Sequence, residues 1–246
     1  MFKTLSTQTD KIRRFAKIVA LTQRRGADIA KRARKHGRDP KHAQSIMTKW
    51  ANEMLDILQV KVTAKGKVGS EPALFIGNHM SYIDIPLIMS QVPVVFVAKR
   101  ELSKWPIFGE ALTSAGTVFV DRDSVHSRKD AAEAIAPSIK EWGQSVGVFA
   151  SGTTRLAEEK QWRWGAFSIA KRFDLLVQPF RLNYDPPRTA AFIGEDHFVP
   201  HLWNVLGSRL HATIEIHDPV IVDDPEQEAI RWWKWTRELT ANNTVS

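Results

Sequence analysis

The spacing of apolar residues changes near position 58 of the chain. Before that point, apolar side chains recur at helical spacing among basic ones, in two groups: Phe15, Ile18, Val19 and Leu21, then Ile46, Trp50, Met54, Leu55 and Ile57. A basic tract from Lys31 to Arg38 lies between the groups and ends at Gly37 and Pro40. The pattern predicts an N-terminal hairpin of two helices, the second covering Lys41 to Leu58.

From Gln59 onward, short apolar runs alternate with stretches of helical periodicity. The runs predict strands at 60–63, 73–76, 92–98, 117–120, 146–149, 175–180, 189–193 and 211–216. Helices are expected at 85–90, 127–142 and 164–173, and a last helix begins at Asp224-Pro225 and runs to about Asn242. Such alternation predicts an α/β fold with a mixed, mainly parallel sheet wrapped by helices. We expect a hairpin over residues 1–58 and one further domain over 59–246.

The basic residues are concentrated in the hairpin. Residues 1–50 carry 14 Lys or Arg against three Asp or Glu, whereas the remainder carries 21 against 24. A basic segment favours a polyanion, either nucleic acid or an anionic membrane surface. The interleaved apolar residues favour the membrane surface, and an ordinary hairpin with a solvated face remains the alternative. No clear helix–turn–helix pattern argues for nucleic acid, so we expect no nucleic-acid partner.

Composition excludes several classes of protein and site. The chain has no cysteine, which excludes a disulfide scaffold, a thiolate zinc site, an iron–sulfur cluster and a cysteine nucleophile. The histidines late in the chain have no metal-ligand spacing, so no metal site is expected, and phosphate-loop and dinucleotide fingerprints are absent. Apolar runs such as 92–98 are far shorter than the roughly 20 residues of a membrane-spanning helix. With no signal-peptide pattern, the expected location is the cytoplasm.

The candidate chemistry begins where the predicted strand 73–76 ends. His79 follows the strand almost directly, and Asp84 comes five residues later, before Pro86. On one continuous helix these side chains would lie about 140° apart, so they can meet only if a turn separates them. A carboxylate on one imidazole nitrogen fixes the tautomer and makes the other nitrogen a better base. The alternative is that Asp84 caps the helix and His79 is a polar residue with ordinary partners.

The segment Asn78-His79-xxxx-Asp84 resembles the H-x4-D signature of the glycerolipid acyltransferases, the family of 1-acylglycerol-3-phosphate acyltransferase. Further blocks resemble the same family in the same order: residues 96–102 with Pro106 and Gly109, residues 116–122, residues 149–155, Gly165-Ala166, and Val177 with Pro179. The resemblance covers roughly residues 50–185, and four blocks in order make it specific.

The resemblance implies transfer of a fatty acyl group from acyl-CoA or acyl-carrier protein, with no further cofactor. The implied acceptor is the sn-2 hydroxyl of 1-acylglycerol 3-phosphate, which gives phosphatidic acid in phospholipid biosynthesis. His79 would be the general base and Asp84 its orienting carboxylate. Arg122 matches the position that holds the acceptor phosphate.

Three further residues are weaker candidates for substrate binding. Lys99 is a secondary candidate for the phosphate, and Gly152 and Thr153 would approach it through backbone N–H groups. Taken alone, these residues favour ordinary structural roles: a surface salt bridge for Arg122, a solvated side chain for Lys99, and a simple turn for Gly152 and Thr153. Because a lysolipid acceptor lies in a bilayer, we expect a peripheral enzyme at the cytoplasmic face of an anionic membrane.

The third block departs from the family pattern. Ser151 stands where the family carries Glu, Ala150 where it carries Pro, and Arg155 lies one place later than usual. The loss of a carboxylate weakens the assignment of the head group more than the assignment of acyl transfer. Another lysolipid, such as a lyso-ornithine lipid, is therefore an alternative acceptor. A non-catalytic lipid- or nucleic-acid-binding protein is the alternative from another class.

Overall fold

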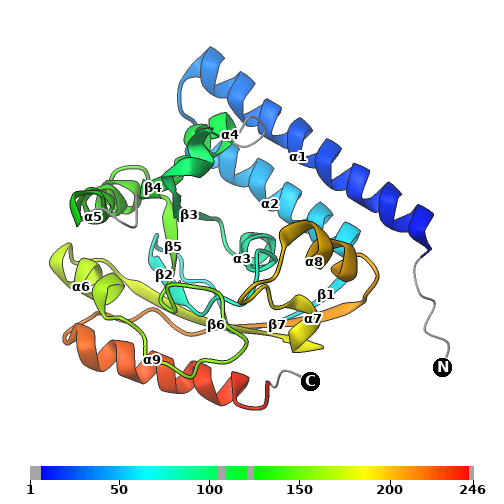
Figure 1. Cartoon of the computed structure of the whole chain (residues 1–246). Coiled ribbons are helices and arrows are strands. Elements are labelled where there is room, and N and C mark those ends of the chain that lie inside the picture. Colours follow the sequence, from blue (N-terminus) through cyan, green and yellow to red (C-terminus); the bar gives the residue numbers. More distant parts are fainter. Residues whose placement is uncertain (1–6, 105–108, 121–124, 244–246) are drawn as a thin grey trace.

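The computed structural model describes residues 7–104, 109–120 and 125–243 (Figure 1). Within them, one sheet has the strand order β1-β7-β6-β2-β5-β3-β4. Its strands are β1 (Val60–Lys65), β2 (Leu74–Gly77), β3 (Val94–Lys99), β4 (Val118–Val120), β5 (Ser145–Phe149), β6 (Val177–Asp185) and β7 (Leu210–Ile216). Neighbouring strands are parallel except β6 and β7. The predicted mixed, mainly parallel sheet is confirmed.

Helices cover both faces of the sheet (Figure 1). One layer holds α1 (Gln8–His36), α2 (Pro40–Leu58), α3 (Asp84–Gln91) and α8 (Phe198–Val205), and the other holds α5 (Val125–Lys140), α6 (Gly165–Arg172) and α9 (Pro225–Thr240). Shorter elements are a 3-10 turn at Arg100–Lys104, α4 (Gly109–Ala115) and α7 (Pro187–Ala190). Each layer buries its own apolar cluster against the sheet.

The predicted N-terminal helix pair is present, and its inner face belongs to the core of the sheet. Leu21 of α1 and Met54 and Leu58 of α2 are buried in the same cluster as residues of the sheet and of α3. The buried Arg14 donates to the backbone carbonyls of Ile57 and Leu206, which ties α1 to the end of α2 and to the end of α8. The domain boundary at residue 58 stays a prediction, but the hairpin packs as part of the body.

The basic tract extends α1 rather than separating two helices. Helix α1 runs to His36, and the chain turns at Gly37, whose φ of +78° favours glycine. Asp39 then caps α2 by accepting the N–H of His42, and Pro40 stands at its first position. Most of the basic tract therefore forms the last turns of a long helix.

The strand expected at 189–193 is wrong. Pro187 begins the short helix α7, which ends at Ala190, and irregular chain follows. Proline at the first helical position has a preset φ and no N–H to pair in a sheet. Ala190 and Ala191 are fully buried there, so the apolar run reflects burial rather than a strand. Helices α4 and α8 had no counterpart among the sequence predictions.

The carboxyl end of β2 is held at the centre of the sheet. All four residues of β2 are buried, and β5 and β6 pair with it on either side. A Cβ at Gly77 would lie 2.5 Å from the backbone oxygen of Phe180, so only glycine fits. The buried amide of Asn78 then exchanges two 2.9 Å hydrogen bonds with the backbone of Leu182. These contacts fix the start of the following turn, which carries His79.

Candidate active site

His79 and Asp84 meet across the turn that joins β2 to α3. The Nδ1 atom of His79 lies 2.7 Å from Oδ2 of Asp84, whose side chain is completely buried. The same oxygen accepts the backbone N–H groups of Met80 at 2.7 Å and Ser81 at 2.9 Å. The turn therefore wraps around the carboxylate. Because Nδ1 donates to Asp84, the other ring nitrogen, Nε2, is left as the acceptor.

A second strand supplies a further partner for Asp84. The hydroxyl of Tyr184, near the end of β6, donates to Oδ1 of Asp84 at 2.7 Å. Burial, and then the charge and hydrogen bond of Asp84, raise the pKa of Tyr184 well above its usual value. The phenol therefore stays protonated and remains a donor. Sequence reasoning missed Tyr184, because 100 positions separate it from Asp84 and no local motif marks it.

The imidazole ring is also held from one face. It stacks on Phe149 at the end of β5, with ring centroids 3.9 Å apart and planes 9° apart. Phe149 in turn stacks on Phe96 of β3, at 5.2 Å and 9°. The stack restricts rotation of the ring, and the π face of Phe149 favours a positive charge on the imidazole.

The backbone of His79 is fixed by the loop that follows β5. Its N–H donates to the hydroxyl of Ser151 at 3.2 Å, and its carbonyl accepts the N–H of Arg155 at 2.8 Å. Gly152, at φ +73°, and Thr153 form the exposed turn between them. The structure thus brings Gly152 and Thr153 to the edge of the sheet that carries His79.

For two of the other sequence-predicted residues, Lys99 and Arg122, the structure gives less information. Lys99 is the last residue of β3, which pairs with β5, so its backbone ends at the same edge of the sheet. Arg122 lies outside the described residues. The proposed roles of Lys99, Arg122, Gly152 and Thr153 in substrate binding stay predictions.

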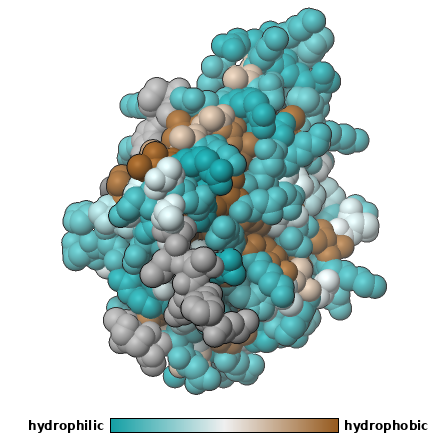
Figure 2. All heavy atoms as spheres, turned by 90° about the vertical axis from the view of Figure 1, so that its right-hand side faces the viewer, coloured by the Kyte–Doolittle hydropathy of each residue, from teal (hydrophilic) through white to brown (hydrophobic). Residues whose placement is uncertain are grey.

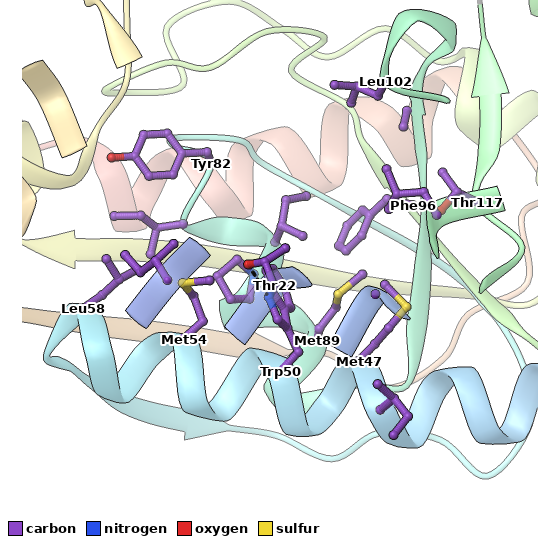
Figure 3. Close-up of a pocket in the computed structure, with 18 of the residues that line it drawn as sticks. Thr22, Met47, Trp50, Met54, Leu58, Tyr82, Met89, Phe96, Leu102 and Thr117 are labelled. Carbon is purple, nitrogen blue, oxygen red and sulfur yellow. Dashed lines mark hydrogen bonds between the residues drawn. The ribbon is translucent and has the colours of Figure 1, made fainter. Parts of the chain in front are cut away.

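An apolar cavity of about 350 Å³ lies between the hairpin and the sheet. Figure 3 shows Trp50 and Met54 pointing from α2 to the side where Met89 of α3 and Phe96 of β3 lie. The indole of Trp50 donates to the hydroxyl of Thr22 at 3.1 Å, which satisfies both polar groups within the apolar wall. Because Phe96 both lines the cavity and stacks on Phe149, only two rings separate the cavity from the imidazole of His79.

A second tyrosine stands at the wall of this cavity. The hydroxyl of Tyr82 donates to Nδ1 of His201 at 2.9 Å, because Nε2 of His201 donates to the carbonyl of Ala191. Burial lowers the pKa of His201, which keeps the ring neutral. His201 therefore holds Tyr82 in place.

Neither a cluster of metal ligands nor a helix able to span a membrane is present among the described residues. No group of three or more His, Cys, Asp or Glu side chains there could hold a metal ion. Among the same residues, no helix combines the length and apolar character needed to span a bilayer.

Comparison with known proteins gives consistent matches. The family model described as Acyltransferase matches residues 59–183. A lyso-ornithine lipid O-acyltransferase of Pseudomonas aeruginosa is 30% identical over 210 residues, which cover 82% of this chain and 81% of that protein. A second enzyme of that name, from Rhizobium meliloti, is 30% identical over 176 residues, or 64% of this chain and 60% of that protein.

Two further matches carry another name. A 1-acyl-sn-glycerol-3-phosphate acyltransferase of Neisseria gonorrhoeae is 33% identical over 81 residues, or 33% of this chain and 31% of that protein. The crystal structure of the 1-acyl-sn-glycerophosphate acyltransferase PlsC from Thermotoga maritima matches with a TM-score of 0.62. That match covers 93% of this chain and 96% of the other at 20% identity, so it supports the fold.

The two tyrosines provide a test of the buried Asp84. Tyr184→Phe removes a hydrogen bond to a charged group and leaves Oδ1 without its phenol donor, so we expect a loss of about 1.5–3 kcal/mol in the free energy of unfolding. Tyr82→Phe removes a bond to a neutral imidazole and should cost about 1 kcal/mol. Urea unfolding of both variants measures the difference. Equal losses would contradict the assignment of Asp84 as a buried carboxylate.

Proposed function

Because the chain belongs to the Acyltransferase family, we propose that it moves a fatty acyl group from an acyl thioester to the hydroxyl of a lysolipid, with His79 as general base. The observation that carries this proposal is the 2.7 Å contact between Nδ1 of His79 and the buried Asp84. It leaves Nε2 of a partly exposed ring to accept a proton at the carboxyl edge of the sheet. Ligands collect at this edge in open α/β sheets.

The proposed reaction needs one proton acceptor and no covalent enzyme intermediate. Nε2 of His79 takes the proton of the acceptor hydroxyl as its oxygen bonds to the thioester carbonyl carbon. The tetrahedral adduct then expels the thiolate by breaking the C–S bond, and the imidazolium returns the proton to sulfur. Asp84 and the face of Phe149 stabilise the imidazolium between these steps.

The apolar cavity is the proposed site of the acyl chain. It adjoins the ring stack that leads to His79, and Met47, Met54 and Met89 contribute flexible apolar side chains to its wall. Each buried methylene contributes about 0.8 kcal/mol, so the cavity can hold a chain without polar contacts. The thioester would then lie at the mouth of the cavity, next to the imidazole.

A lyso-ornithine lipid is the first candidate acceptor. The Pseudomonas aeruginosa enzyme that carries this name is similar over 82% of the chain, and Ser151 replaces the Glu of the glycerophosphate pattern. The second candidate is 1-acylglycerol 3-phosphate, which the motif blocks and the Neisseria gonorrhoeae match favour. Both head groups carry an anion, and we propose that Arg122 binds it, with Lys99, Gly152 and Thr153 as further contacts.

The acceptor is tested by acyl transfer from labelled acyl-CoA and from acylated carrier protein to a panel of lysolipids. We expect a higher kcat/KM with lyso-ornithine lipid than with 1-acylglycerol 3-phosphate or lysophosphatidylcholine. A preference for 1-acylglycerol 3-phosphate would establish the second candidate. Binding of lysolipids without any transfer would contradict the enzymatic proposal.

His79→Ala should abolish transfer in a folded protein, because loss of a general base costs about 10²–10⁴-fold in rate. Asp84→Asn should also lose activity, since an amide can stabilise the wrong imidazole tautomer. Turnover is compared with that of His217→Ala, a histidine beyond β7 that should keep full activity. Circular dichroism checks the fold of each variant. Near-wild-type turnover of His79→Ala would reject the assigned base.

A membrane surface is the proposed location of the enzyme, as a peripheral protein at the cytoplasmic face. Lys17, Arg24, Lys31 and Lys35 are exposed and lie on one face of α1, since their spacings of seven, seven and four residues are close to whole helical turns. Apolar side chains are exposed as well, at Ile12 and Phe15 of α1 and at Phe198 and Val199 of α8. Figure 2 shows hydrophobic atoms between hydrophilic ones on the side that faces right in Figure 1. This combination favours anionic lipid.

Substitution tests this location better than deletion, because the inner face of the hairpin belongs to the core. Lys17→Gln/Lys31→Gln should weaken binding to anionic vesicles by up to about 30-fold at low salt, at about 1 kcal/mol per residue. The matched control is Lys140→Gln/Lys234→Gln, which removes two exposed lysines from α5 and α9. Co-sedimentation measures both variants, with DNA as competitor. Equal losses in the two variants, or a preference for DNA, would contradict the proposed surface.

A further inference from the structure

A buried carboxylate that the proposed reaction does not use lies behind the active site. Glu158, in the loop between β5 and α6, is only 1% exposed. Its Oε1 accepts the hydroxyl of Ser151 at 2.8 Å, and its Oε2 accepts the indole N–H of Trp162 at 2.7 Å. Burial raises the pKa of Glu158, while these two hydrogen bonds and the positive charge of Arg155 act in the opposite direction. Both oxygens therefore have a donor.

Ser151 links this carboxylate to His79. Its hydroxyl oxygen accepts the backbone N–H of His79 at 3.2 Å and donates its own proton to Glu158. The direction of these two hydrogen bonds is fixed, because a peptide N–H can only donate and the serine hydroxyl has a single proton. Without Glu158 as acceptor, the hydroxyl can rotate, and its lone pair no longer has to face His79.

Glu158 is itself anchored from the opposite side of the sheet. Its backbone N–H donates to the hydroxyl of Thr240 at 3.2 Å, and its carbonyl accepts the indole N–H of Trp233 at 2.9 Å. Thr240 and Trp233 both belong to α9. The backbone of Glu158 is thus fixed to the far helix layer, and its carboxylate, through Ser151, connects that layer to the turn that carries the imidazole.

We propose that Glu158 is a positioning residue for His79, acting through the hydroxyl of Ser151. We call the two hydrogen bonds that connect Glu158 to Ser151 and Ser151 to the N–H of His79 the relay. Its role rests on the proposed role of His79 as general base. The contact between Asp84 and Nδ1 sets the tautomer of the ring, whereas the relay sets the position of the backbone from which the ring projects. A shift of about 1 Å at a reacting group can cost about 100-fold in rate. Ser151 therefore contributes to the rate by positioning His79, although its side chain carries no charge.

The relay predicts a loss in kcat rather than in KM. Ser151→Ala removes the link, and Glu158→Gln replaces one carboxylate oxygen with a donor, so the side chain cannot accept from both Ser151 and Trp162. Each variant should lose about 10-fold or more in kcat, with KM for acyl donor and acceptor unchanged. The double variant should lose no more than the worse single variant, because the two groups act as one unit.

The chain offers closely matched controls for both changes. Ser145 in β5 accepts the N–H of Ala73 at 3.2 Å, so Ser145→Ala removes the same kind of bond at the other end of the strand. Glu228 accepts the indole N–H of Trp232 four residues later at 2.6 Å, as Glu158 does with Trp162. Ser145→Ala and Glu228→Gln should lower the melting temperature to an extent similar to that of Ser151→Ala and Glu158→Gln. Unlike those variants, they should keep wild-type kcat.

The outcomes separate the relay from the proposed function. If kcat of Ser151→Ala equals that of Ser145→Ala while His79→Ala is inactive, the relay is wrong and the base assignment stands. An active His79→Ala overturns both. Losses of kcat that multiply in the double variant also overturn the relay. If Glu158→Gln does not fold, Ser151→Ala is compared with Ser151→Thr, which restores the hydroxyl and should restore kcat.

Discussion

The buried carboxylate of Asp84 is the constraint around which the site is built. A charge without solvent is tolerated only when it is fully hydrogen-bonded, and Asp84 receives four donors: the N–H groups of Met80 and Ser81, Nδ1 of His79 and the hydroxyl of Tyr184. The first three close the turn between β2 and α3, and the fourth comes from β6. The same bonds that make the carboxylate tolerable therefore orient the imidazole.

The neighbouring strands of the sheet hold this arrangement in one conformation. Strand β2 lies between β5 and β6, and the amide of Asn78 continues its pairing with β6 for one more residue. Strand β5 ends at Phe149, which packs against the imidazole ring, and the loop beyond it bonds both backbone groups of His79. The neighbours of β2 thus restrain His79 from both sides, β5 and its loop directly and β6 through Asn78 and Asp84. Their common edge leaves the Nε2 side of the ring for substrate.

The hairpin has two faces with different tasks in the proposed function. Its inner face completes the core and, with α3 and β3, encloses the apolar cavity next to the ring stack. Its outer face carries exposed lysines and arginines. A helix pair of this kind would place the entrance for an acyl chain beside the surface that attracts anionic lipid, so that substrate binding and docking involve the same element.

Local pattern in the sequence was enough to predict the strand–turn–helix at His79 and Asp84, the second helix of the hairpin and the mainly parallel sheet. These features depend on neighbours a few residues apart, and the motif blocks that indicated acyl transfer are equally local. The strand expected at 189–193 failed because burial of Ala190 and Ala191 gives the same apolar run as a strand. The partners of the site could not be predicted: Tyr184 lies 100 positions from Asp84, and Ser151 lies 72 positions from His79. Only the order of strands in the sheet brings such residues together, because contacts between them depend on tertiary packing and leave no periodic trace along the chain.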